Sequence, residues 1–146
     1  MATSYWSGTD TQLIPSDRIK YTDGTYADTR VFDRVTQASH GFTGRVPVYY
    51  NTTSSLWVAA QANAVGTIAT HIAKVVDSNT LDVVLNGKVT DTSHGLTAGQ
   101  YYFTSSSSSG TLTTTEPTTQ GTVSNPMLYV VDANTYWVLG WRPTLN

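Results

Sequence analysis

A short phrase that occurs twice restricts what this chain of 146 residues can fold into. Ser39–Thr43 reads SHGFT, and a near copy, SHGLT, begins 54 positions later. Val75–Asp77 reads VVD and returns 55 positions later as Val130–Asp132. Between these words the pairs YY and GT also recur in the same order, at offsets of 52 and 55. Four matches in register predict an internal duplication.

The duplication divides the chain into three parts. We predict an N-terminal segment at 1–35, a first β unit at 36–90 and a second β unit at 91–146. Apolar and polar residues alternate with a period of two in these units, and turn pairs such as Asn86-Gly87 separate the runs. The Ala-rich run Trp57–Val76 is broken by a glycine and predicts strand, turn and strand. The expected fold is therefore all-β, with two tandem related units, each a sandwich or a small barrel.

Composition limits the functions that fit this chain. It has 26 Thr and 14 Ser, and only 12% of its residues are charged, about half the usual share. Nine Tyr and four Trp supply buriable area, which favours a folded domain over disorder. A net charge of −2 without a Lys/Arg run argues against nucleic-acid binding. With no cysteine there are no disulfides, and no apolar run has the length that membrane insertion requires.

The two copies differ on one face of one strand. In the first copy, Thr80–Thr90 predicts a single strand with one buried and one wet face. The buried face Leu81, Val83, Leu85 becomes Tyr136, Val138, Gly140, and the wet face Asp82, Val84, Asn86 becomes Trp137, Leu139, Trp141. A strand that is apolar on both faces is covered on both, either by the rest of the chain or by another subunit. We favour another subunit, because Trp and Tyr are enriched at interface centres, and we assign Trp137, Leu139 and Trp141 to that interface.

Histidines and carboxylates offer little catalytic chemistry. His40 and His94 each stand alone in a Ser-His-Gly turn, and we expect each ring to bond local backbone. The alternative is a metal site where three-fold symmetry gathers three copies on an axis. Asp77 and Asp132 predict Asx turns. Glu116 is the one glutamate, so an acid and base pair for glycoside hydrolysis cannot be assembled. We predict no enzyme, no cofactor and no metal.

Two further segments carry expectations. The low-complexity run Ser105–Thr119 predicts a flexible hairpin tip, with an adaptable contact loop as the alternative. In the N-terminal segment, Tyr5 and Trp6 stand in a Ser/Thr/Gly context, and we expect them to anchor the protein to another component. The alternative is that this segment packs along its own barrel.

The stretch Ser93–Pro143 contains a series of short motifs. SHGLTAG is followed by YY, a Ser/Thr run, TEP, and an apolar strand that closes in WRP. This series resembles the terminal β module of tailed-bacteriophage fibre and head-decoration proteins, and Ser39–Val89 resembles the module that usually precedes it. The resemblance covers about 36–143. It implies a homotrimer packed about a three-fold axis.

The resemblance and the altered face lead to one functional hypothesis. We expect a non-enzymatic structural component of a tailed-phage virion, a short trimeric capsid decoration or head/tail fibre protein attached through its N-terminal segment. Its partners would be two further copies and phage capsid or tail proteins, and its place would be the virion, after assembly in the host cytoplasm. The alternative is an adhesin module for host-surface glycan, with Tyr49 and Tyr101 facing the ligand.

Overall fold

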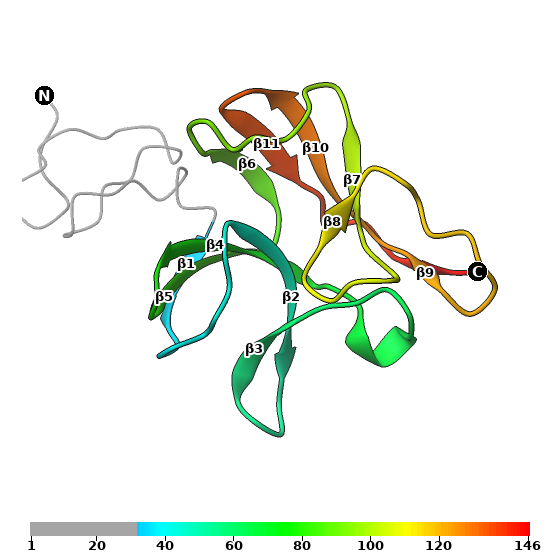
Figure 1. The fold of residues 1–146 in the computed structure, drawn as a ribbon, viewed down its shortest axis with the longest axis horizontal. Helices are drawn as coiled ribbons and strands as arrows, with labels where there is room; N and C mark the ends of the chain where they lie inside the picture. Colours follow the sequence, from blue (N-terminus) through cyan, green and yellow to red (C-terminus); the bar gives the residue numbers. More distant parts are fainter. Residues whose placement is uncertain (1–31) are drawn as a thin grey trace, which may run out of the picture. The chain divides into compact units, whose positions relative to one another are not determined.

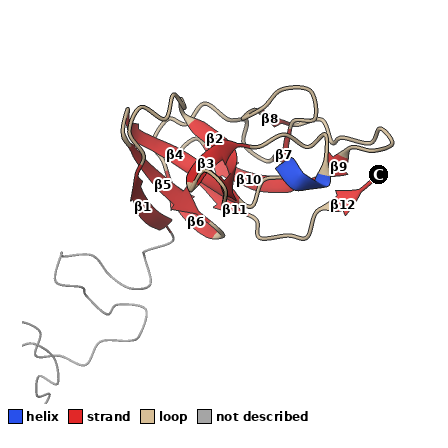
Figure 2. Ribbon diagram, turned by 90° about the horizontal axis from the view of Figure 1, so that it is seen from below, coloured by secondary structure: helices blue, strands red, loops and turns tan. Residues whose placement is uncertain are grey.

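The computed structural model of the chain describes residues 32–146, which form three antiparallel sheets (Figure 1). The first sheet has five strands in the order β1-β5-β4-β2-β3. Its strands are β1 (Phe32–Thr36), β2 (Arg45–Asn51), β3 (Leu56–Ala59), β4 (His71–Asp77) and β5 (Thr80–Val84). A 3₁₀ turn, Val65–Thr67, follows β3 and is drawn in blue in Figure 2.

The second sheet also has five strands, in the order β6-β11-β10-β7-β8. Its strands are β6 (Gly87–Thr90), β7 (Tyr101–Thr104), β8 (Leu112–Thr113), β10 (Pro126–Asp132) and β11 (Thr135–Val138). A small third sheet pairs β9 (Val123–Ser124) with β12 (Thr144–Leu145). The prediction of an all-β fold is confirmed.

The two large sheets correspond strand for strand. β6, β11, β10, β7 and β8 stand in the second sheet where β1, β5, β4, β2 and β3 stand in the first. Both longest hairpins shift register at the repeated VVD word, between Val75 and Asp77 in β4 and between Val130 and Asp132 in β10. Strand β6 belongs to residues 36–90 but pairs with β11, and β1 crosses the 35/36 boundary. The three-part division itself stays a prediction.

The run Thr80–Thr90 forms two strands and not the single strand that its alternation predicts. β5 ends at Val84, and Gly87, with φ of 116°, begins β6 in the other sheet. Such a φ suits glycine, so the turn out of the first sheet falls here. The face assignment changes as a result: Leu85 is 54% exposed, while Asp82 and Val84 are buried.

The two Ser-His-Gly loops have matching hydrogen bonds. The His40 ring donates from Nε2 to the carbonyl of Asp77 (2.7 Å) and accepts at Nδ1 from the N–H of Phe42 (3.0 Å). His94 makes the corresponding bonds to Asp132 and Leu96 at 2.8 and 3.1 Å. A carbonyl only accepts and an amide N–H only donates, so these partners set the ring tautomer. The prediction that each ring bonds local backbone is confirmed at Nδ1, whereas the Nε2 partner of each ring lies 37 or 38 residues further along the chain.

The aspartates of the VVD words also have local roles. The Asp77 carboxylate accepts from the N–H of Asn79 at 2.8 Å, and Asp132 accepts from Asn134 at 2.8 Å. Both are therefore Asx turns, as predicted. The side chain of Asn79 in turn accepts from the N–H of Ser39, which ties the histidine loop to the β4–β5 hairpin.

Removing the two histidines should have unequal effects, because their surroundings differ. His94 is 5% exposed and meets the Tyr136 ring edge-on at 5.5 Å, whereas His40 is only half-buried. We expect His94→Ala to lower the free energy of unfolding by about 2–3 kcal/mol and His40→Ala by about 1 kcal/mol. Urea unfolding at one protein concentration measures both losses. Equal losses would contradict a structural difference between the loops.

The first sheet buries apolar side chains on both faces, because Pro47, Ile72 and Val84 are fully buried on the face opposite its core cluster. The first core comprises Val46, Val48, Ala73, Leu81 and Val83. In the second sheet the fully or nearly fully buried residues include Leu128, Val130, Tyr136 and Val138. These positions alternate along their strands with residues on the opposite face, as the period of two requires.

The serine run after β7 is tied to the first half of the chain. The N–H of Ala62 donates to the carbonyl of Ser105 (2.9 Å), and the N–H of Gly110 donates to the carbonyl of Ala60 (2.7 Å). Gly110 has φ of 70°, and a side chain there would lie 3.1 Å from the Ala59 Cβ. Residues 105–111 connect β7 to β8, so the run Ser105–Thr119 contains a strand. Residues 105–110 are held by backbone hydrogen bonds and are not the flexible hairpin tip that the sequence predicts.

The anchoring residues proposed from the sequence, Tyr5 and Trp6, lie outside the described residues. Within 32–146, no helix has the length and apolar character needed to cross a membrane.

Candidate interaction face

A row of four charged residues crosses the first sheet on the face opposite its core. Arg34 stands opposite Asp82, Asp82 opposite Lys74, and Lys74 opposite Arg45. We call these four residues the charged row. Arg34 binds the Asp82 carboxylate with two guanidinium nitrogens, at 2.7 and 2.9 Å.

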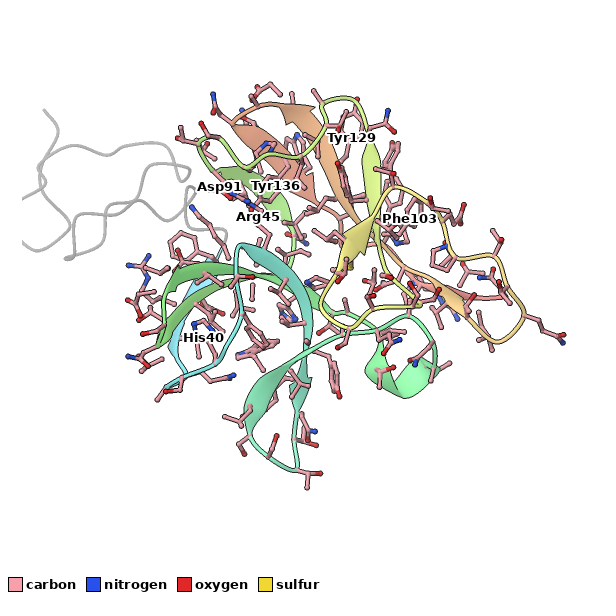
Figure 3. All side chains as sticks on the ribbon, in the orientation of Figure 1. His40, Arg45, Asp91, Phe103, Tyr129 and Tyr136 are labelled. Carbon is pink, nitrogen blue, oxygen red and sulfur yellow. The ribbon has the colours of Figure 1, made fainter. Side chains whose placement is uncertain are left out.

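The chain covers one end of the charged row with its own next segment. Residues 91–94, which we call the Asp91 loop, follow β6 directly. Arg45 Nε forms an ion pair with Asp91, Arg45 Nη1 donates to the carbonyl of His94 at 2.8 Å, and Lys74 Nζ lies 3.4 Å from the Asp91 carboxylate. Figure 3 labels Arg45 and Asp91 where the two sheets meet. The contact joins the first sheet to the second.

The electrostatics of this junction follow from its burial. Burial alone would raise the pKa of the Asp91 carboxyl, but the hydrogen bond and charge of Arg45, with the charge of Lys74, outweigh it and hold that pKa below its usual range. The Tyr136 hydroxyl donates to Asp91 at 3.4 Å, and burial raises the pKa of this phenol. Asp91 is therefore ionised at neutral pH and the phenol is protonated.

The corresponding row of the second sheet is aromatic. Tyr101 stands opposite Tyr129, Tyr129 opposite Trp137, and Trp137 opposite Lys88. These are the strand positions that Arg45, Lys74, Asp82 and Arg34 occupy in the first sheet, so the structure sets Tyr101 against Arg45 and not against Tyr49, its partner in the YY match. Three residues of the charged row are thus replaced by aromatic side chains.

Trp141 extends this aromatic surface. Its ring centroid lies 5.9 Å from that of Tyr101, and the Tyr101 and Tyr129 centroids are 4.9 Å apart. We call Tyr101, Tyr129, Trp137 and Trp141 the aromatic face. Tyr101 is 44% exposed, Trp137 46% and Trp141 55%. Large aromatic side chains gathered on one exposed face of a small domain indicate an interaction site.

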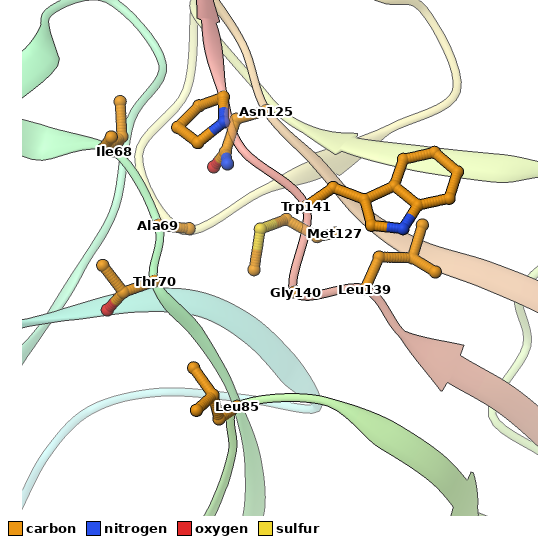
Figure 4. A pocket seen from close by; sticks show the side chains of 10 residues that line it. Ile68, Ala69, Thr70, Leu85, Asn125, Met127, Leu139, Gly140 and Trp141 are labelled. Atoms are coloured by element: carbon orange, nitrogen blue, oxygen red, sulfur yellow. The ribbon is translucent and has the colours of Figure 1, made fainter.

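An apolar cleft of about 240 Å³ adjoins the aromatic face (Figure 4). Its lining residues come from both halves of the chain: Ile68, Ala69, Thr70, Leu85, Asn125, Met127, Leu139, Gly140, Trp141 and Pro143. Leu85 and Trp141 are exposed, so part of the lining faces solvent. Trp141 belongs to both the cleft and the aromatic face.

The structure brings some of the residues assigned from sequence together and separates others. Trp137, Trp141 and Tyr101 share the aromatic face, and Leu139 is half-buried in the cleft beside it. Tyr49 lies on β2 of the first sheet and is half-buried.

Sequence reasoning missed Tyr129 and the Asp91 junction. The offset of 55 places Lys74 on Tyr129, so the repeat already contained a signal for the change from cation to aromatic. The partnership of Asp91 with Arg45 had no such signal, because 46 residues separate the two along the chain.

The aromatic face suits a limited set of chemistries. It can bury apolar area against protein or stack against a flat apolar surface such as a sugar ring. Among residues 32–146, no three His, Asp or Glu side chains are grouped so as to hold a metal ion.

Comparison with protein-family models, curated proteins and solved structures finds no match for this chain.

Proposed function

We propose that this protein is a non-enzymatic structural component of a tailed-phage virion. In this proposal it is a short homotrimeric capsid-decoration or head/tail fibre protein, built from two tandem related β units and attached to capsid or tail proteins by its N-terminal segment. Tyr5 and Trp6 are the proposed anchoring residues. The observation that carries the assembly part is the exposed aromatic face, since a trimer supplies the cover that the small unit lacks.

The tandem relation is supported by agreement at three levels. The sequence words recur in order, the strands of the two sheets have the same order, and the loops at His40 and His94 make the same hydrogen bonds. A single agreement could arise from common turn chemistry. Agreement in motif order, strand order and loop geometry together favours duplication of one unit.

The proposed subunit interface contains Trp137, Leu139 and Trp141, with Tyr101 and Tyr129 beside them. Burying each of these large side chains contributes about 1.5–3 kcal/mol. Aromatic residues are enriched at interface centres because they bury much area with few rotatable bonds.

Placing a charge on the aromatic face should separate the subunits. Trp137→Asp is expected to cost about 2–4 kcal/mol at each interface, which raises the dissociation constant of each contact by roughly 1.5 to 3 orders of magnitude. The first sheet has an aspartate, Asp82, at the corresponding position, opposite Arg34. The variant should therefore fold, with the new carboxylate opposite Lys88.

Light scattering coupled to size exclusion measures the mass of each variant. Tyr50→Asp is the matched control, because Tyr50 is 46% exposed, as is Trp137, but lies on the first sheet. We expect trimers for the wild type and Tyr50→Asp and monomers for Trp137→Asp. A Trp137→Asp protein that stays fully trimeric would rule out this face as the interface.

A glycan-binding adhesin module is the second candidate. The observation that favours it is the contact of Tyr101 with Tyr129 and Trp141, which forms an exposed surface on which a sugar ring could stack. Tyr49, the other tyrosine assigned to ligand, would act from the first sheet. Binding of the wild-type protein to a glycan array, lost in Tyr101→Ala, would favour this candidate over assembly alone.

A further inference from the structure

The chain contains an internal example of how this kind of sheet face is covered. The Asp91 loop lies against the end of the charged row, where Arg45 and Lys74 bind its carboxylate and Arg45 also binds the carbonyl of His94. Arg45 is only 19% exposed as a result, and Asp91 only 9%. One unit thus presents a sheet face, and the following unit presents a loop that covers it.

The aromatic face is a second sheet face of this kind, but it remains exposed. It occupies the same strand positions in the second large sheet, where Tyr101, Trp137 and Trp141 are exposed. The covered face of the first sheet carries the charged row together with the fully buried Pro47, Ile72 and Val84, whereas the corresponding row of the second sheet is aromatic and exposed.

The first unit carries a counterpart of the Asp91 loop, in which the Gln37 side chain donates to the Trp57 carbonyl at 2.9 Å and accepts from the Trp57 N–H at 2.8 Å. Residues 37–40, which we call the Gln37 loop, follow β1 as the Asp91 loop follows β6. The N–H of Gln37 donates to the carbonyl of Asn79 at 2.8 Å, and the N–H of Asp91 donates to that of Asn134 at 2.8 Å. The third residue of each loop has positive φ, 53° at Ser39 and 56° at Ser93.

The charges of the two loops match the two faces. Asp91 is opposite a face that carries Arg45 and Lys74. Gln37, at the corresponding position, is uncharged, as are Tyr101 and Tyr129, which replace those two cations. A carboxylate set against tyrosine rings would lose water without gaining a counter-charge. The neutral loop is therefore the better match for the aromatic face.

We infer that the Gln37 loop of a second copy of this chain lies on the aromatic face, so that subunits associate head to tail in the manner of the internal junction. This inference rests on the proposed function, since it specifies how the trimer is built. A contact between two different surfaces closes into a ring of three when each subunit is rotated by a third of a turn, whereas a self-complementary contact between two aromatic faces closes as a dimer. The head-to-tail contact is the one that a trimer requires.

Cysteine cross-linking tests the inference on the intact chain, which has no cysteine of its own. Ala38, in the Gln37 loop, and Tyr101, on the aromatic face, are both exposed, so Ala38→Cys and Tyr101→Cys should fold. Each single variant and their equimolar mixture are treated with a short bismaleimide reagent. The products are separated on denaturing gels.

We expect cross-linked dimers in the mixture and little in either variant alone. A chain that carries both substitutions should form covalently closed trimers, and adding Trp137→Asp should abolish them. Tyr50→Cys, mixed with Ala38→Cys, is the control at a surface with matched exposure and should remain uncross-linked.

Three outcomes would overturn the inference. Cross-linking of Tyr101→Cys to itself, without a mixed product, would show two aromatic faces in contact. A trimeric wild type without the mixed product would leave the proposed function intact and rule out the head-to-tail contact. A wild type that is monomeric by light scattering would instead contradict the proposed trimer, together with the contact that rests on it.

Discussion

Replacing Tyr136 by alanine is expected to lower the free energy of unfolding by about 4 kcal/mol. The side chain is completely buried, packs against the His94 ring at 5.5 Å, and donates from its hydroxyl towards Asp91 at 3.4 Å. Truncation removes a large buried ring and leaves a cavity that the rigid strands β6 and β10 on either side of β11 cannot close. Urea unfolding measures the loss. All variants are compared at one protein concentration, because subunit association adds to apparent stability.

Two matched variants separate the contributions to that loss. Tyr136→Phe keeps the ring and removes only a long hydrogen bond, so its cost should be about 1 kcal/mol or less. Tyr50→Ala removes the same side chain from a site that is 46% exposed and should cost about 1 kcal/mol. A loss at Tyr136→Ala no greater than that at Tyr50→Ala would be incompatible with a core position.

Replacing Asp91 by asparagine should destabilise the protein by about 2–3 kcal/mol. The substitution leaves Arg45 and Lys74 at the sheet junction without their counter-charge, and Arg45 is too covered to be fully rehydrated. Asp82→Asn is the matched control, because its partner Arg34 is 58% exposed and can return to water. That control should cost about 1 kcal/mol or less.

The Asp91 carboxylate should also make the free energy of unfolding depend on pH. The pKa of Asp91 is lower in the folded protein than its ordinary value, so the folded state gains from its ionised form. That contribution is fully present above the ordinary aspartate pKa of about 4 and is lost as the pH falls through the lower folded value. We expect Asp91→Asn to lose less stability than the wild type between about pH 5 and pH 2. Parallel acid-unfolding curves for the two proteins would contradict this role.

Local chemistry explains what could be predicted from sequence. Three predicted features depend on neighbours within a few residues: the bond from each histidine ring to the N–H two residues on, the Asx turns at Asp77 and Asp132, and the period-two strands. Each is present in the structure. The repeat also indicated that Trp137 and Trp141 stand where the first copy has Asp82 and Asn86.

Long-range pairing explains what could not be predicted. The sequence signal of alternation runs through Asn86 and Gly87 without a break, and it cannot show that the chain leaves one sheet for another there. Asp82 and Val84 were assigned to a wet face for the same reason, although Asp82 pairs with Arg34, 48 residues earlier. Tyr129 could be assigned to the aromatic face only from the strand pairing, which places it opposite Tyr101 and Trp137.

The sequence by itself determined that the chain is all-β and that short motifs occur twice in it, because strand periodicity, turn residues and repeats are properties of short segments. Only the tertiary structure decided which strands share a sheet, that Asp91 covers one end of the charged row, and that three aromatic side chains of the corresponding row remain at the surface with Trp141. The physical reason is that register and burial depend on contacts between residues about 50 positions apart. Such contacts leave no periodicity in the chain.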